Sequence, residues 1–149
     1  MATEMTQSGA STTQGDGTVK VLGILTLVAG IVLIAAGIVT WIAITNQLSA
    51  ENITVSGDAQ WFADEPVDGP LTAFSQADVI NTHALESTGG LTYAELGRDD
   101  PARQTAMTAS FLRASLFTSV VAYGVAAMAA GIGLVFTFVG GSLMRISRG

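Results

Sequence analysis

The only histidine of this chain, His83, is the residue type best suited to acid–base chemistry near neutral pH. It stands in "QADVINTHALESTGG" (76–90), between Asp78 and Glu86, where it could carry protons or respond to pH. A non-haem iron facial triad needs two histidines and a carboxylate, and no serine stands in a nucleophile-elbow context. We therefore predict that His83 builds or decorates a helix, and we expect no catalytic residue, metal site or cofactor. A pH-sensing role stays open.

The composition is unusual for a soluble protein. Apolar residues make up 49% of the chain and charged residues 12%, which favours a membrane protein over a cytosolic one. The chain contains no cysteine, which excludes disulfides, thiolate metal sites and cysteine nucleophiles. Only six residues are Lys or Arg and none of them form a run, so we expect no nucleic-acid partner.

Two long stretches carry no charge at all. No charged residue stands between Lys20 and Glu51, or between Arg113 and Arg145. At about 1.5 Å per helical residue, each run can cross a hydrocarbon core of about 30 Å. Neither run contains proline, and unpaired backbone groups are costly in lipid, so both should be continuous helices.

These runs predict an all-α membrane protein. We expect a two-helix transmembrane hairpin, with one span at 19–47 and the other at 114–144. Between them lies a mainly helical extracytoplasmic segment, 48–113, which contains ten of the twelve acidic residues.

The basic residues predict the orientation of the hairpin. Lys20 flanks the first span on the side where Arg145 and Arg148 flank the second. The segment between the spans also carries three arginines: Arg98, Arg103 and Arg113. Two of these lie more than ten residues from the span and count for less. We expect a multi-pass protein of the plasma membrane with both termini in the cytoplasm and the 48–113 segment outside.

The two ends of the chain are expected to be simple. Residues 1–18 are rich in Ser, Thr, Gly and Gln, which predicts a disordered cytoplasmic tail, and residues 145–149 form a short second tail. The first apolar run could instead be a cleaved signal peptide, because small residues precede Glu51. The run is about twice the usual 7–15 residues, and no Lys or Arg stands in the tail before it, which favours an uncleaved span.

Glycines recur every seven residues in both apolar runs. The repeats are Gly23, Gly30 and Gly37 in the first run, and Gly124 with Gly131 and Gly133 with Gly140 in the second. A seven-residue period keeps small residues on one face, where they let two helix backbones approach closely. We expect the hairpin to pack through Gly23, Gly30, Gly37, Gly124 and Gly131. Whether the same face also serves self-association stays open.

The outer segment contains recognisable helix signals. Apolar residues recur at spacings of three and four from 71 to 88, which predicts an amphipathic helix ended by Gly89 and Gly90. "ENITVS" (51–56) is typical of extended chain, and "DEPVDGP" (64–70) of a loop. In "DDP", Asp100 is the expected N-cap and Pro101 the first residue of one helix that continues through the second span.

The antiparallel arrangement also predicts a register. With span centres near Val32 and Ala130, Arg113 should lie level with residues 49–51. We therefore expect an Arg113–Glu51 ion pair at the outer boundary. The alternative is an unpaired Arg113 that extends to lipid phosphates.

Several stretches resemble a known family. They are "QLSAENITV", "GPLTAFSQADVINTHALESTGGLTYAEL", "RDDP" and "TASFLRASLFTSVVAYGVAA". They are similar to a group of small two-span membrane proteins from actinobacteria, labelled as aromatic ring-opening dioxygenase, small-subunit type, over roughly residues 21–140. The resemblance implies an iron-dependent activity, or an accessory subunit that need not hold the metal. No catalytic residues are established for the group, so none is carried over.

Three classes of function remain open. The residues favour a non-catalytic interaction or accessory protein that presents its outer segment to another envelope protein, or to a second copy. A dioxygenase accessory subunit and a small oligomeric pore are the alternatives. An exposed face with Trp61, Phe62 or Phe74 would be the expected docking surface.

Overall fold

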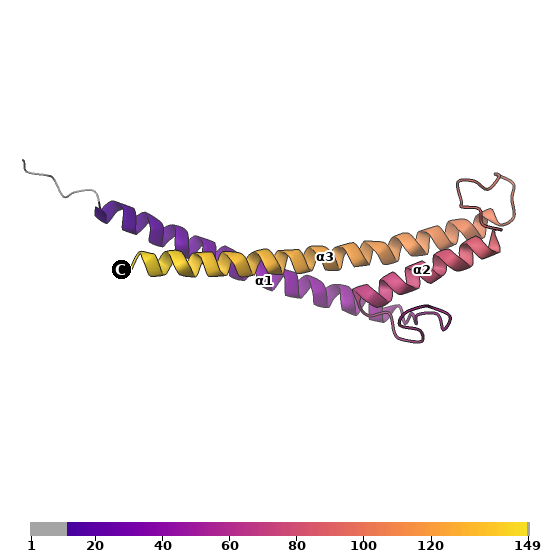
Figure 1. Ribbon diagram of the computed structural model, residues 1–149, viewed down its shortest axis with the longest axis horizontal. Helices are drawn as coiled ribbons and strands as arrows, with labels where there is room; N and C mark the ends of the chain where they lie inside the picture. The colour runs from indigo at the N-terminus through magenta and orange to yellow at the C-terminus, as the bar shows by residue number, and fades with distance from the viewer. Residues whose placement is uncertain (1–11, 149) are drawn as a thin grey trace, which may run out of the picture. The chain divides into compact units, whose positions relative to one another are not determined.

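The computed structural model describes residues 12–148. In chain order these form α1 (Thr12–Ala50), α2 (Pro70–Ser87) and α3 (Arg103–Ile146), and no strand forms within the described residues (Figure 1). Both α1 and α3 are long and apolar enough to cross a membrane, by length and composition. The expected all-α architecture with two candidate spans is confirmed to that extent.

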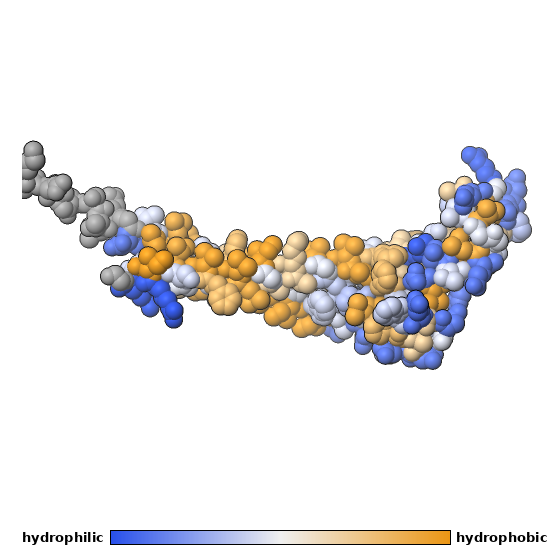
Figure 2. All heavy atoms as spheres, in the orientation of Figure 1, coloured by the Kyte–Doolittle hydropathy of each residue, from blue (hydrophilic) through white to orange (hydrophobic). Residues whose placement is uncertain are grey.

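The chain divides into two compact units. Unit 1 comprises residues 1–37 and 128–149, so its described part contains the first portion of α1 and the last portion of α3. Unit 2 comprises residues 38–127 and contains α2 with the remainder of both long helices. On the face drawn in Figure 2, hydrophobic surface covers the long helices and hydrophilic surface gathers over the segment between them.

The N-terminal boundary of α1 differs from the expectation. The helix begins at Thr12, so residues 12–18 are helical rather than disordered, while residues 1–11 lie outside the described residues. A turn added to an existing helix does not carry the free-energy cost of helix nucleation. The polar residues 12–18 can therefore extend α1 although they lack an apolar pattern. At the other end α3 continues to Ile146, two residues beyond the expected boundary.

Both ends of α2 are determined by local sequence. Gly69 is extended at the N-cap, and Pro70 takes the first helical position, where its missing N–H has no partner to lose. At the other end Gly89 has a φ of +67°, and the N–H of Gly90 donates to the Leu85 carbonyl at 2.7 Å. This is a Schellman closure, which favours glycine because the backbone is left-handed. The expected helix is confirmed, shifted by one residue at each end.

The start of α3 is capped as the sequence predicts. The Asp100 carboxylate accepts the N–H of Ala102 at 2.8 Å, and the Asp100 carbonyl accepts the N–H of Arg103 at 3.0 Å. Pro101 lies in this first turn, and the regular helix begins two residues after it. Asp100 therefore satisfies an N–H that would otherwise have no intrahelical acceptor.

Arg103 holds the connection between α2 and α3 in place. Its guanidinium donates to the carbonyls of Tyr93 (3.2 Å) and Leu96 (2.6 Å) and lies 4.1 Å from the centre of the Tyr93 ring. Within the connection, the Glu95 carboxylate accepts the backbone N–H of Thr92 at 2.8 Å, and this bond lowers the pKa of Glu95. The polar connection is thus ordered by charge-assisted hydrogen bonds.

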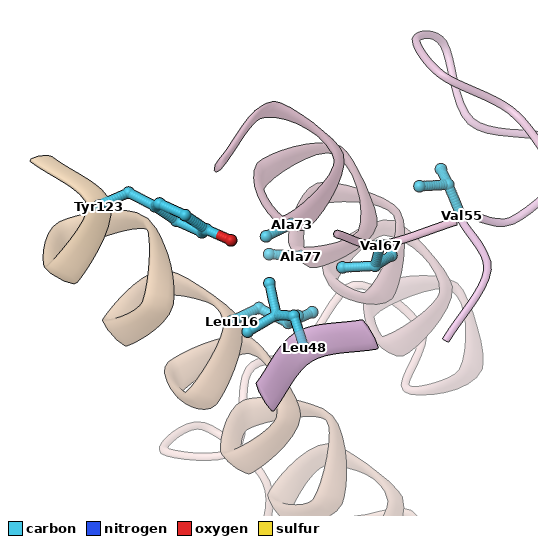
Figure 3. Packing of buried hydrophobic residues seen from close by; sticks show 7 residues of the cluster. All are labelled: Leu48, Val55, Val67, Ala73, Ala77, Leu116 and Tyr123. Carbon is cyan, nitrogen blue, oxygen red and sulfur yellow. The ribbon is translucent and has the colours of Figure 1, made fainter. Parts of the chain in front are cut away.

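The core of unit 2 collects residues from every element of that unit. Its buried members are Leu48, Val55, Val67, Ala73, Ala77, Leu116 and Tyr123 (Figure 3). Val55 and Val67 are only 1% exposed although both stand in the connection between α1 and α2. Burial of one such side chain contributes about 1.5–3 kcal/mol, so this connection is folded onto the helices.

Tyr123 links three parts of unit 2. Its hydroxyl donates to the Asp68 carbonyl at 3.1 Å, so the hydroxyl of Thr45 on α1 is the donor across the 2.8 Å that separates it from the Tyr123 oxygen. Its ring meets Trp41 edge-on, with centroids 4.7 Å apart. A buried hydroxyl without partners would cost about 1–3 kcal/mol. These contacts hold α1, α3 and the residues before α2 together.

The connection between α1 and α2 folds back on itself. Three backbone hydrogen bonds form a short ladder: Val55 N–H to Glu65 O, Asp64 N–H to Val55 O, and Val67 N–H to Ile53 O. The stretch 51–56 is therefore partly extended, as expected, whereas 64–70, expected as a loop, supplies the second side of the ladder. Asn52, Phe62 and Asp64 take positive φ values at the turns.

Candidate functional site

His83 forms an ion pair that joins α2 to the preceding connection. Its Nε2 lies 2.5 Å from Oδ2 of Asp58, and the two side chains are 45% and 61% exposed. The hydrogen bond to Asp58 raises the pKa of His83, and the same bond lowers the pKa of Asp58. The pair therefore favours a charged imidazolium beside a carboxylate in the folded protein.

The geometry of this pair is that of a structural contact. Asp58 stands 25 residues before His83 in the sequence. Glu86, on the same helix as His83, raises the pKa of the histidine less than Asp58 does. Within residues 12–148, no group of three His, Cys, Asp or Glu side chains is placed to hold a metal ion. His83 lies on the surface of α2, as predicted, and its bond to Asp58 ties the α1–α2 connection to that helix.

In unit 1 the helices α1 and α3 approach each other at paired glycines. Gly30 faces Gly133: a Cβ placed on either one would lie 2.6 Å from the carbonyl oxygen of the other. Gly23 faces Gly140, where the corresponding distances are 3.1 and 2.7 Å. Real Cβ atoms essentially never come within 3.0 Å, so the Gly30–Gly133 approach requires glycine. The predicted register, which set Gly30 level with residue 132, is within one residue of this pairing.

Two of the five predicted packing glycines lie on the wrong face. A Cβ on Gly124 or Gly131 would meet no heavy atom within 4 Å, and both residues are exposed. Gly131 and Gly133 are about 200° apart around the helix, so the two glycine repeats of α3 face nearly opposite sides. Spacing alone does not say which repeat faces α1, and the prediction for these two residues was wrong. Gly37, by contrast, is buried.

The expected Arg113–Glu51 ion pair is also absent from the described chain. Arg113 instead lies 5.9 Å from the centre of the Phe117 ring and borders a cavity of about 40 Å³ that Asn81 of α2 also lines. Its Nε is buried and makes no hydrogen bond to any described residue. Glu51 directly follows α1, whereas α3 is rotated so that Arg113 faces α2, which explains why the pair does not form.

A groove lies beside the first half of α2. It encloses about 450 Å³ and is lined mainly by Trp61, Phe62, Leu71, Phe74 and Val79. The exposed fractions are 66% for Trp61, 64% for Leu71 and 51% for Phe74, so the groove leaves a large apolar surface open. We call it the aromatic groove. It contains all three residues that the sequence singled out as a docking face.

A second groove of about 510 Å³ lies between α2 and α3. We call it the interhelical groove. Its lining includes Ile80 and His83 from α2 and Thr105, Thr108 and Leu112 from α3. These side chains offer both apolar contact and hydrogen-bonding groups, a mixture typical of protein docking surfaces.

No family model, no curated protein and no solved structure matches this chain. The arrangement of its own residues is therefore the basis for what can be said of its function.

Proposed function

We propose that this chain is an integral protein of the cell envelope, acting as a non-catalytic interaction or accessory subunit. In this proposal α1 and α3 form a membrane hairpin, both termini lie in the cytoplasm, and the segment between the spans lies outside. The length and apolar character of the two helices support insertion. The flanking Lys20, Arg145 and Arg148 support the orientation.

The interhelical groove is the observation that carries the proposal. It is built on two helices that are joined by a capped turn and by the Arg103 contacts, so its walls are held in position. Folded walls reduce the entropy lost on binding, which is what a docking surface requires. One polar side chain of the lining, His83, already has a structural partner in Asp58.

The spans offer further surface for a partner. In the most apolar window of each long helix, 17% of residues are buried, so most of that surface faces outward. In a bilayer it would contact lipid or the helices of another chain. The partner can therefore be engaged at the outer segment, at the spans, or at both.

Topology is tested with single cysteines, because the natural chain has none. Ser87→Cys places a thiol at the exposed end of α2, and Ser147→Cys places one beyond α3. In intact cells a membrane-impermeant maleimide should label the first and not the second, and permeabilisation should allow both. Labelling of Ser147→Cys alone in intact cells would reverse the proposed orientation.

The partner is tested by crosslinking in living cells. A photo-crosslinking amino acid at Thr108, in the interhelical groove, should capture a specific membrane or envelope protein that co-purifies in mild detergent. The same amino acid at Phe111, which is 75% exposed on α3 and lines neither groove, is the matched control. Recovery of the chain by itself, with equal crosslinking at both positions, would contradict an accessory role.

A further inference from the structure

Within unit 2, the aromatic groove is held against α3. Phe74 meets Phe117 of α3 edge-on, with ring centroids 5.7 Å apart. The Ser75 hydroxyl donates to the Trp61 carbonyl at 2.6 Å, which holds the connection against α2. The exposed apolar side chains of the groove therefore occupy a set position relative to α3.

That position is close to the outer edge of the hydrocarbon core. The uncharged run 114–144 is centred on residue 129. At 1.5 Å per residue, Tyr123 lies about 9 Å and Phe117 about 18 Å from the centre. The half-thickness of the core is about 15 Å, so these two residues lie on either side of its edge. Tyr123 is bonded to the residues before α2 and Phe117 to Phe74, so the groove lies at this edge as well.

The residues of the aromatic groove are of the types expected at the edge of the hydrocarbon core. Trp is enriched where hydrocarbon meets the headgroups, because its ring is apolar and its N–H is polar. The stretch 51–70 contains five acidic residues and no Lys or Arg, and Asp78 lines the groove itself. The Asp78 carboxylate in the lining of the groove repels anionic headgroups and attracts a headgroup that carries an ammonium.

We infer that the aromatic groove binds a zwitterionic phospholipid of the outer leaflet, with an acyl chain against Trp61, Leu71 and Phe74 and its ammonium beside Asp78. The inference rests on the proposed membrane insertion. A groove at the edge of the hydrocarbon core is in contact with lipid, so no second protein is needed to cover it. An acyl chain matches its open apolar surface. The segment before α2 would then be an interfacial anchor in addition to the two spans.

The two tryptophans allow this inference and the insertion itself to be tested separately. Trp41→Phe leaves Trp61 as the only tryptophan and reports on the groove, whereas Trp61→Phe leaves Trp41, which lies in α1. Each variant is reconstituted in phosphatidylcholine vesicles with bromine on the acyl chains, either near the carbonyl or near the terminal methyl. We expect Trp61 to be quenched most by bromine near the carbonyl, with blue-shifted emission and little quenching by aqueous acrylamide.

The controls separate the possible failures. If Trp41 is not quenched by brominated lipid, membrane insertion fails, and the proposed function fails with it. If Trp41 is quenched while Trp61 is quenched only by acrylamide, the inference is overturned and the insertion stands. If Trp61 is shielded from both quenchers and the chain is crosslinked to itself, a second copy covers the groove, which also overturns the inference.

Two further changes test the role of the groove and its charge. Leu71→Ser, in the lining of the groove, should reduce quenching of Trp61 by lipid. Met107→Ser changes an exposed apolar residue near the start of α3, outside the groove, and should not reduce it. Replacing phosphatidylcholine with anionic phosphatidylglycerol should lower the quenching of Trp61 and leave that of Trp41 unchanged. Equal quenching of Trp61 in both lipids would overturn the assignment of a zwitterionic headgroup.

Discussion

Replacement of Gly30 by alanine should weaken the packing of α1 on α3 in unit 1. The added Cβ would lie 2.6 Å from the Gly133 carbonyl oxygen, whereas ordinary van der Waals contact begins at 3.4 Å, so the backbones must separate by about 0.8 Å. A gap of that size removes about a quarter to a half of each dispersion contact in the seam. Overpacking in well-packed sites costs about 1–3 kcal/mol, and we expect a loss in this range.

The matched control is Gly131→Ala, in the same helix pair but at a position where the added Cβ would have no described heavy atom within 4 Å. Both changes gain the same helix propensity, about 1 kcal/mol at most, so this term cancels in the comparison. Dyes on Lys20→Cys and Ser147→Cys would report helix separation by energy transfer during titration with SDS in mixed micelles. Equal stability of the two alanine variants would refute the argument from close approach.

Three other perturbations have predictable outcomes. Asp58→Asn should return the pKa of His83 toward its ordinary 6.5, followed by NMR titration of the single histidine. The pKa of His83 is raised in the folded chain, so its contribution to stability is present below pH 6.5 and is lost as pH rises through the folded pKa. The pKa of Asp58 is lowered in the folded chain, so its contribution is lost as pH falls through that lowered pKa. The pair therefore stabilises the connection most between these two limits. Amide exchange in 53–67 is compared as protection factors, that is, relative to the unstructured chain at the same pH. Protection that stays the same on both sides of the His83 titration, as followed by NMR in the same sample, would contradict this. Tyr123→Phe should cost about 1–3 kcal/mol in SDS titration, because two polar groups lose their partner, and a variant as stable as the natural chain would argue against it. Asp100→Ala should cost about 0.5–2 kcal/mol and speed amide exchange in the first turn of α3, whereas Asp99→Ala, whose side chain makes no hydrogen bond within residues 12–148, should not.

The features that depend on distance along the chain were predictable from the sequence. Aligning the centres of the two charge-free runs predicts the register, and Gly30 indeed faces Gly133, one residue from the expected level. The ends of α2 at Pro70 and Gly89, and the cap at Asp100, depend only on neighbouring backbone groups. Local chemistry and rise per residue are enough for such features.

The features that depend on rotation about a helix axis were not predictable. Arg113 lies on the α2 side of α3, and a Cβ on Gly131 would meet no described heavy atom within 4 Å; the spacing of residues along the chain determines neither rotation. The bond of Asp58 to His83 bridges 25 residues and depends on how the connection folds back. That fold requires left-handed backbone at Phe62 and Asp64, which neither residue type indicates.

The short ladder before α2 also affects how the outer segment meets other chains. On its second side, the N–H groups of Asp64 and Val67 donate across the ladder, that of Glu65 donates to Phe62, and Pro66 has none. A strand from another molecule would therefore find no free backbone donor along 64–67. Exposed edges are where proteins recruit foreign strands and begin to aggregate, and this edge is closed to such recruitment. A segment with so much open apolar surface is thereby protected from strand addition on that side, and its contacts with neighbours must form through side chains.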